Sequence, residues 1–349
     1  MQDSMLSEKS LEILEHNILN DLLCLKIIGV LFEKSIIQNW ASKAIDTPVA
    51  VQDLPPPLLA VLKRSKVITE SNIVSPIFLL LIRERGVFFE QKVKYLLIAI
   101  QDFLQSAELL LWDPEAFMQS SRIFSLFDYS KGFDPSAQAR ADTQSWCHYV
   151  SALTRAEAGC VVDRIMGSLG DDRPQRVLEL GGNLGVFAAE FEKSISFLDY
   201  KIIDIPQVCD LGRAYIKNKA PESRIRFVSG DMFVDDWCDE KGRPPDLIIF
   251  KSVLHDWPVH RAETLIRKSC SLLPIGGQLC IAERCNFAAE NLHSNSLFDV
   301  ANIIFSPFYR DPEVYVSMID SISEHDFKMQ IHPLDLDMRW FCLVAEKLG

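Results

Sequence analysis

The spacing of apolar and polar residues changes along this chain near residue 176. Beyond that point, short apolar runs alternate with amphipathic stretches. The apolar runs predict β-strands at 176–180, 199–203, 224–228, 246–251 and 277–283. The amphipathic stretches predict α-helices at 184–193, 206–217 and 258–273. This alternation is typical of a parallel sheet that helices cover on both faces.

The carboxyl-terminal end of the chain breaks the alternation. A helix is expected near 312–322, and two strands are expected at 327–332 and 339–345. The segment from Pro333 to Asp337 joins these two strands, so they resemble a hairpin. The sheet is therefore expected to close with an antiparallel edge.

Before residue 176, the apolar residues are spaced as in α-helices. Apolar residues recur every three or four positions over about 8–40, and helices are expected again over about 86–130 and 138–169. The apolar face of the first stretch is broad, which fits burial against a second subunit or against another part of the same chain. We therefore expect a helical dimerisation domain over 1–135 and an α/β domain over 136–349.

Between the first helices, prolines interrupt the pattern. A short helix at 58–65 precedes a small hairpin over 67–74, centred on Glu70-Ser71-Asn72. A helix followed by a hairpin outlines a winged-helix module, which serves either DNA binding or structure and dimerisation. The structural reading is favoured, because basic residues cluster here only at Lys63, Arg64 and Lys66.

Composition narrows the class of protein. The chain has 349 residues, of which 48% are hydrophobic, so it can form a sizeable core. Its formal net charge of −12 argues against nucleic acid or an anionic membrane as the main partner. No apolar run is long enough to span a membrane, and the first ten residues lack a signal-peptide pattern. A cytoplasmic location is therefore expected.

The nine cysteines are scattered, without a Cys-x-x-Cys pair or a Cys/His cluster at zinc spacing. Several lie in apolar strand or helix runs. We interpret them as reduced core thiols and expect neither a disulfide framework nor a metal site.

Candidate chemistry lies at the ends of the predicted strands. The strand at 176–180 runs into a glycine turn, Gly181-Gly182-Asn183-Leu184-Gly185, which feeds a helix, as in nucleotide-type sites. Asp204, Asp231 and His255 follow later strands. Ligands of open α/β sheets bind at the carboxyl ends of the strands. Asp204 lies 19 residues beyond Gly185, where a carboxylate can bind a ribose diol. It can also serve as the N-cap of the next helix.

Several motifs occur in a fixed order and together resemble the small-molecule O-methyltransferases that use S-adenosylmethionine, the group of caffeate-type and bacterial antibiotic-tailoring enzymes. The motifs are the glycine turn, Asp204-Ile205-Pro206-Gln207-Val208, Gly230-Asp231-Met232-Phe233, Lys251 to Trp257, and the turn Pro274 to Gly277 before a strand ending in Glu283. The resemblance implies a Rossmann-like sheet and a homodimer. It is strongest from about 140 to 330.

The resemblance also implies roles for individual residues. Glu179, Gly181 and Lys251 would lie near the cofactor, and Asp204 would bind its ribose. Asp231 and Met232 would hold the adenine. His255 would be the general base, with Asp256 beside it and Glu283 orienting its ring. A histidine with a pKa near 6.5 suits that work near neutral pH. Taken alone, His255 also fits a plain strand-end histidine.

Three positions depart from the family pattern. Glu179 stands where an aspartate is usual, and Asn183 stands where a third glycine is usual. Asparagine tolerates positive φ, so cofactor binding is expected to survive. Tyr309-Arg310-Asp311 replaces a Glu-Arg-Thr segment that would supply a second carboxylate to the base.

The acceptor is expected to be a flat, moderately apolar phenol or polyketide-like ring. Its candidate contacts are Phe124, Phe127, Trp146, Tyr149, Phe298, Asn302 and Phe305. The sequence predicts an O-methyltransferase of secondary metabolism. Two alternatives remain: a relative that uses the fold for cyclisation, hydroxylation or decarboxylation, and a DNA-binding regulator.

Overall fold

The chain packs into two compact units. The computed structural model describes residues 2–43, 47–51, 54–126, 129–169, 174–195, 199–285, 297, 299–322, 326–336 and 339–349. The first unit comprises Met1–Leu126 with His293–Ile304, and the second comprises Phe127–Leu292 with Phe305–Gly349. The domain limits 1–135 and 136–349 remain a prediction. That prediction did not include the return of residues 293–304 to the first unit.

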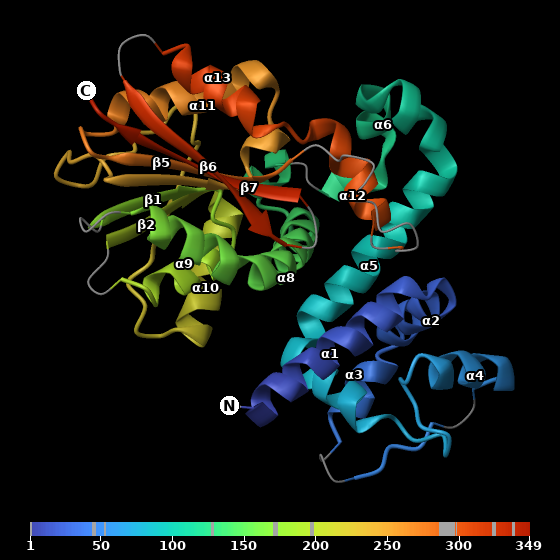
Figure 1. Cartoon of the computed structure of the whole chain (residues 1–349). Helices are drawn as coiled ribbons and strands as arrows, with labels where there is room; N and C mark the ends of the chain where they lie inside the picture. Colours follow the sequence, from blue (N-terminus) through green and yellow to red (C-terminus); the bar gives the residue numbers. More distant parts are fainter. Residues whose placement is uncertain are drawn as a thin grey trace. The chain divides into compact units, whose positions relative to one another are not determined.

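The second unit is built on a seven-stranded sheet (Figure 1). Its strands are β1 (Arg176–Leu180), β2 (Asp199–Asp204), β3 (Arg226–Ser229), β4 (Leu247–Lys251), β5 (Gln278–Arg284), β6 (Phe327–Asp335) and β7 (Arg339–Lys347). They lie in the order β3-β2-β1-β4-β5-β7-β6. The first five are parallel, and β7 pairs antiparallel with both β5 and β6. The predicted parallel sheet with an antiparallel edge is confirmed.

Helices cover both faces of this sheet, as predicted (Figure 1). They are α8 (Ala137–Ser168), α9 (Val186–Glu192), α10 (Pro206–Lys219), α11 (Val259–Leu272) and α13 (Pro312–Asp320). Successive residues of a strand point to opposite faces. Val177 accordingly packs in the core with α8, α9 and α10, while Leu178 packs in the core with α11 and α13. Strand β4 is buried along its whole length, which explains its uninterrupted apolar sequence.

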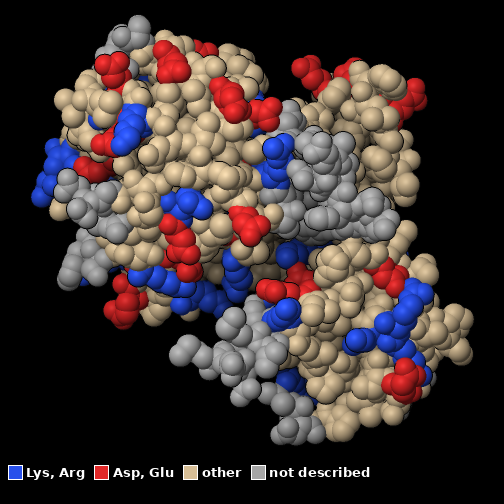
Figure 2. All heavy atoms as spheres, viewed as in Figure 1, with Lys and Arg blue, Asp and Glu red and all other residues tan. Residues whose placement is uncertain are grey.

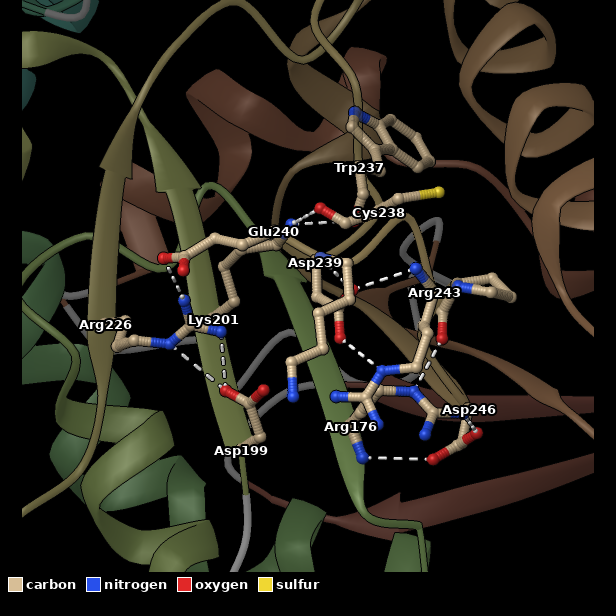
Figure 3. A network of polar contacts seen from close by, with 12 residues as sticks. Arg176, Asp199, Lys201, Arg226, Trp237, Cys238, Asp239, Glu240, Arg243 and Asp246 are labelled. Atoms are coloured by element: carbon tan, nitrogen blue, oxygen red, sulfur yellow. Dashed lines mark hydrogen bonds and ion pairs between the residues drawn. The ribbon is translucent and has the colours of Figure 1, made fainter.

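The amino-terminal ends of β1 to β3 are joined by a polar network, shown in Figure 3. Arg176 binds Asp246 in the segment before β4, and Arg226 binds Asp199 at 2.7 Å. The Lys201 Nζ donates to the carbonyls of Trp237 and Cys238, both at 2.7 Å. These contacts hold one end of the sheet, and the glycine turn lies at the other.

The first unit is mainly helical. Its helices are α1 (Gln2–Asn20), α2 (Leu22–Glu33), α3 (Ile36–Ala41), α4 (Pro56–Arg64), α5 (Pro76–Trp112), α6 (Pro114–Ser120), α7 (Arg122–Leu126) and most of α12 (Asp299–Phe305). Helix α5 begins ten residues before the predicted start at 86, because Pro76 fits the first turn of a helix. None of the helices that the structure describes combines the length and apolar content needed to cross a bilayer.

The predicted hairpin over 67–74 forms only in outline. Two isolated bridges, Ala50↔Ile73 and Ile68↔Val74, take the place of a continuous ladder. Asn72 turns the chain with a left-handed φ of 58°. The helix before it starts two residues earlier than predicted, with prolines in its first turn.

Candidate functional site

The glycine turn after β1 carries three residues with positive φ: Gly181 at 69°, Asn183 at 54° and Gly185 at 77°. The Gly181 N–H donates to the Ile203 carbonyl at 2.9 Å, which holds the turn against β2. A Cβ at Gly181 would lie 2.8 Å from Val253 Cγ2, closer than real Cβ contacts. The turn therefore needs glycine at 181 both for its backbone angle and for its close approach to the segment that leads to His255.

We expect Gly181→Ala to lower the free energy of unfolding by about 1–2 kcal/mol from the left-handed backbone alone, with a further loss from crowding Val253. Urea denaturation measures the change. Gly242→Ala is the matched control, because Gly242 has a φ of 72° and open space around its Cβ position. Equal losses in the two variants would contradict the crowding argument.

Asp204 ends β2 with its side chain directed at the glycine turn. Its Oδ2 accepts from the Asn183 N–H at 2.9 Å, and its Oδ1 accepts from the Ile205 N–H at 2.8 Å. Helix α10 begins at Pro206 with Ile205 at its cap position, so Asp204 is not the N-cap of this helix. Burial raises the pKa of Asp204 to about 7, although both N–H groups oppose that rise. Further hydrogen-bond donors from a ligand would stabilise the ionised form of this carboxylate.

Glu179 lies on β1 beneath the same turn. Its Oε2 accepts from the Tyr200 hydroxyl at 2.9 Å. Burial raises the pKa of Glu179 to about 7, against the effects of the Tyr200 hydrogen bond and the Lys251 charge. A Cβ at Gly182 would lie 3.0 Å from the Glu179 carboxyl group, so this carboxyl supports the turn from below.

Asp231 and Met232 lie in the loop after β3. The Asp231 Oδ1 accepts from the Phe233 N–H at 2.9 Å, and the Asp231 N–H donates to Asp235 Oδ2 at 2.6 Å. The Met232 carbonyl accepts from Lys268 Nζ at 3.2 Å, while its side chain packs at the edge of the core. Asp231 is exposed, so its carboxylate faces solvent from a fixed loop.

Lys251 ends β4 in a buried ion cluster that the sequence did not reveal. Its Nζ lies 2.5 Å from Glu157 Oε2 and 3.0 Å from Thr154 Oγ1 on α8. Arg284, at the end of β5, binds the other oxygen of Glu157 at 2.5 Å. Both cations also lie over the Trp340 ring. Glu157 lies within the helix predicted over 138–169. Its side chain is buried and neutralises two strand-end cations.

His255 sits in the short 3₁₀ turn η2 (Leu254–Asp256) just after β4, between two carboxylates. Its Nδ1 lies 2.6 Å from Glu283 Oε2 on β5, and its Nε2 lies 3.3 Å from Asp256 Oδ1. The other Glu283 oxygen accepts from the N–H groups of Val253 and Leu254, both at 2.8 Å. Glu283 therefore fixes both the imidazole and the backbone that carries it.

The charges of this group set its protonation. Burial alone would lower the pKa of His255, but the Glu283 and Asp256 carboxylates outweigh it and raise the pKa above the ordinary value. Burial would raise the pKa of Glu283, yet the imidazole and two backbone N–H groups hold it below its ordinary value. Enclosure raises the pKa of Asp256, against the pull of His255 and of the Tyr129 hydroxyl. The imidazole can thus take a proton while Glu283 stays charged.

The segment that departs from the family pattern closes around the same turn. The Tyr309 ring meets the His255 ring edge-on, with centroids 5.2 Å apart. Arg310 donates to the Leu254 carbonyl at 2.8 Å and also to the Trp257 carbonyl. The position of the missing second carboxylate therefore holds an aromatic wall, and the arginine next to it holds both ends of η2.

The candidate acceptor contacts are only partly placed. Trp146 and Tyr149 are buried side chains of α8 in the second unit, and Trp146 packs edge-on against Tyr129. Phe305 is half-buried against the core of that unit. Phe124 belongs to the first unit, where it packs edge-on against Phe117. Two positions, Phe127 and Phe298, lie outside the described residues, as does the side chain of Asn302.

The structure thus brings Glu179, Gly181, Asp204, Lys251 and the His255 group to the carboxyl-terminal ends of neighbouring strands. Within the described residues, no group of three or more His, Cys, Asp or Glu side chains is arranged to hold a metal ion. Tyr129, Glu157, Arg284 and Arg310 also join the group without having been predicted for it. Arg310 lies in the segment that departs from the family pattern, whereas the other three lie outside the motifs.

A comparison with protein families matches most of the second unit. The O-methyltransferase domain family matches residues 117–317. The curated 3-O-methylredipecamine 2-O-methyltransferase of Carapichea ipecacuanha is 23% identical over 170 residues, 45% of this chain and 44% of that protein. The 3-hydroxy-5-methyl-1-naphthoate 3-O-methyltransferase of Streptomyces sahachiroi is 27% identical over 109 residues, 31% of this chain and 30% of that protein. The chain thus spans less than half the length of these relatives.

Solved structures match over nearly the whole chain. Mitomycin 7-O-methyltransferase MmcR has a TM-score of 0.66 at 14% identity, covering 92% of this chain and 94% of that one. Human N-acetylserotonin methyltransferase in complex with SAM also has a TM-score of 0.66 at 14% identity, covering 93% and 94%. At such identities the likeness concerns the fold, and it agrees with the fold class predicted from the sequence.

Proposed function

We propose a function from the premise that this chain belongs to the O-methyltransferase domain family, which it matches over residues 117–317. It transfers a methyl group from S-adenosylmethionine to a hydroxyl of a small aromatic or polyketide-like metabolite, with His255 as the general base. The observation that carries the proposal is the 2.6 Å contact between Glu283 and His255 Nδ1, two residues beyond Val253, which the glycine turn approaches closely at Gly181. A positioned imidazole beside a nucleotide-type turn is what deprotonation of an acceptor next to a bound donor requires.

The residues at the strand ends fit the cofactor. Asp204 offers a buried acceptor for ribose hydroxyls, and Asp231 offers an exposed one for the adenine beside Met232. Asn183 Nδ2 is buried and has no hydrogen-bond partner among the described residues, so the turn retains a donor for a polar ligand. Glu179 lies beneath this turn, and Lys251 lies at the end of β4. When bound, S-adenosylmethionine supplies an activated methyl group, whose transfer breaks the sulfur–carbon bond and leaves the electron pair on sulfur.

The protein's own part in the reaction follows from its hydrogen bonds. Glu283 holds the proton of His255 on Nδ1, so the lone pair of Nε2 is directed away from that carboxylate. Nε2 accepts the proton of the acceptor hydroxyl, and Glu283 stabilises the imidazolium that results. Arg310 keeps η2 from shifting as this charge appears, because it binds carbonyls on both sides of His255.

The direct test is incubation of the purified protein with methyl-labelled S-adenosylmethionine and a panel of phenols and hydroxylated polycyclic aromatics. Labelled ether products are expected from at least one acceptor, together with calorimetric binding of the donor or of its demethylated product. Calorimetry without any donor binding would end the proposal. Binding without transfer to any oxygen would favour the repurposed reaction instead, and the Tyr309 wall beside His255 is the observation that keeps this second candidate.

Cofactor affinity should depend on the protonation of Asp204. Ribose hydroxyls donate, so they favour the ionised carboxylate, and the affinity is expected to rise as the pH passes upward through about 7. Asp204→Asn should lower the affinity by about tenfold to a hundredfold and remove this pH dependence. Calorimetry between pH 5.5 and 8.5, about 1.5 units on either side of pH 7, measures both.

The control is Asp210→Asn, an exposed position on α10, the helix that follows Asp204. A pH dependence that persists in Asp204→Asn would assign the titration to Glu179 instead, because its pKa is also about 7.

The remaining expectations concern partners. A homodimer is supported by large apolar side chains exposed on the first unit, such as Leu104, Leu111 and Trp112. In the view of Figure 2, basic and acidic side chains are intermingled over both units, whereas a nucleic-acid site needs a continuous basic surface. The cytoplasmic location stays a prediction. Sedimentation velocity tests the dimer, and a monomer at micromolar concentration would reject it.

A further inference from the structure

The two ring nitrogens of His255 lie at different distances from their carboxylate partners. Glu283 approaches Nδ1 to 2.6 Å, whereas Asp256 stays 3.3 Å from Nε2. Glu283 is fully buried, and the Asp256 side chain is 24% exposed. Under the proposed function, Nε2 must receive the proton of the acceptor. A carboxylate that bonded Nε2 closely would occupy this position and would hold the imidazole in its protonated form.

A single hydroxyl draws the Asp256 carboxylate the other way. The Tyr129 hydroxyl donates to Asp256 Oδ2 at 2.5 Å, from 127 positions away in the sequence. Tyr129 begins the 3₁₀ helix η1 (Tyr129–Phe133) and is itself held in place by two rings. It stacks on Trp257, with centroids 5.7 Å apart and 21° between the planes, and it packs edge-on against Trp146 at 5.8 Å. The donor is therefore fixed in position.

We propose that Tyr129 is a positioning residue that acts through Asp256: its hydroxyl holds the Asp256 carboxylate away from Nε2 of His255, so that this nitrogen can accept the proton of the methyl acceptor. The inference rests on the function proposed above. In this scheme Glu283 holds Nδ1 and stabilises the imidazolium, while the longer distance to Asp256 leaves Nε2 open to the acceptor. Tyr129 does not touch the acceptor oxygen in this scheme.

Other groups near the imidazole do not reproduce this effect. Among the residues that the structure describes, Glu283 bonds Nδ1 and the backbone of residues 253 and 254. Tyr309 presents a ring edge to His255. The Arg310 charge also favours the ionised form of Asp256, but its hydrogen bonds go to carbonyl groups of the turn. Arg284 is paired with Glu157, and its charge opposes the rise in the pKa of His255. Within the described residues, Tyr129 is the group whose hydrogen bond holds Asp256 away from the reacting nitrogen.

Loss of the Tyr129 hydroxyl is expected to change the pKa of the His255–Asp256 pair. His255 and Asp256 lie 3.3 Å apart and each shifts the pKa of the other, so they titrate as a unit. A donor to the carboxylate favours the charged form, and its removal makes the pair hold its proton to a higher pH. Tyr129→Phe keeps both ring contacts and removes only the donor. We expect the pH at which the pair releases its proton to rise by about one unit, the shift that corresponds to roughly one hydrogen bond to a charged group.

Two measurements follow this shift in the full-length protein. Nuclear magnetic resonance titration of the imidazoles, with the His255 signal assigned by its loss in His255→Gln, reads the pair directly and needs no turnover. The acid limb of kcat/KM should move upward by the same amount, and kcat at pH 7 should fall by about tenfold. In an Asp256→Asn background, Tyr129→Phe should have no further effect. Tyr215→Phe, which removes a hydroxyl bonded to Arg155, is the matched control.

The outcomes separate the two proposals. An unchanged His255 titration in Tyr129→Phe, or an equal loss of kcat with and without Asp256, overturns the role of Tyr129. If Tyr129→Phe fails to fold, 3-fluorotyrosine at position 129 keeps the size and strengthens the donor, so the titration must move to lower pH. A wild-type protein that never methylates an acceptor refutes the proposed function, while the titrations still decide whether Tyr129 restrains Asp256.

Discussion

His255→Ala is expected to lower kcat for methyl transfer by about 10²- to 10⁴-fold, the range of a lost general base, while S-adenosylmethionine still binds as it does to the wild type. The expectation follows from the position of the imidazole. Its Nδ1 is fixed by Glu283, and its own side chain is 10% exposed, so solvent does not readily replace it. Within the described residues, the hydrogen bonds of the glycine turn and of Asp204 do not involve His255.

The measurement is single-turnover transfer of labelled methyl to an acceptor identified from the panel, beside calorimetry with the demethylated donor. His260→Ala serves as control, because His260 is exposed at the start of α11. Wild-type rates in His255→Ala would remove the base assignment. A loss of donor binding in the same variant would mean that His255 supports the cofactor site and not the proton transfer.

The strands were predictable because their signal is local. The apolar run at 246–251 becomes β4 (Leu247–Lys251), and its burial on both faces demands such a run. The prediction for 224–228 was displaced from β3 (Arg226–Ser229), in which only Phe227 is buried and the last two residues are exposed, so the apolar signal at its boundaries is weak. Helix α5 began earlier than expected because the prolines of this stretch were interpreted as interruptions, whereas Pro56 and Pro76 each begin a helix.

The candidate site was predictable only where it follows a strand end. Asp204 and His255 were found because the carboxyl ends of parallel strands meet at one edge of the sheet. Tyr129 could not be found in this way, since its contact with Asp256 depends on side chains from distant segments and not on a local period. The effect of Tyr309 on His255 was also invisible, because a substitution in a motif gives the residue type but not the ring contact that it makes.

The contacts of Glu157 were also not predictable from the sequence. Glu157 lies on the helix that apolar spacing predicted over 138–169, and its side chain is 5% exposed. The spacing could not tell that β4 and β5 each end in a cation directed at it, because that requires the sheet order. The charge balance of the strand ends is therefore a property of the tertiary structure, and it can be tested separately from catalysis.

Glu157→Gln is expected to lower the free energy of unfolding by about 3–5 kcal/mol, because removal of one partner leaves buried charge without compensation. Glu157 binds Lys251 and Arg284 at 2.5 Å each, and the Lys251 side chain is 4% exposed. Urea denaturation without cofactor measures the loss. Glu190→Gln is the control, since its pair with Lys193 is exposed and should contribute about 0–1 kcal/mol.

Adding Lys251→Met to Glu157→Gln should recover part of this loss, because it removes one of the two uncompensated cations. Recovery would identify buried charge, and not lost packing, as the cause, since methionine fills a similar volume without an ammonium group. A loss as small as that of Glu190→Gln, or a double variant less stable than Glu157→Gln alone, would contradict the charge argument. In that case the cluster would contribute through its packing on Trp340, which both cations contact.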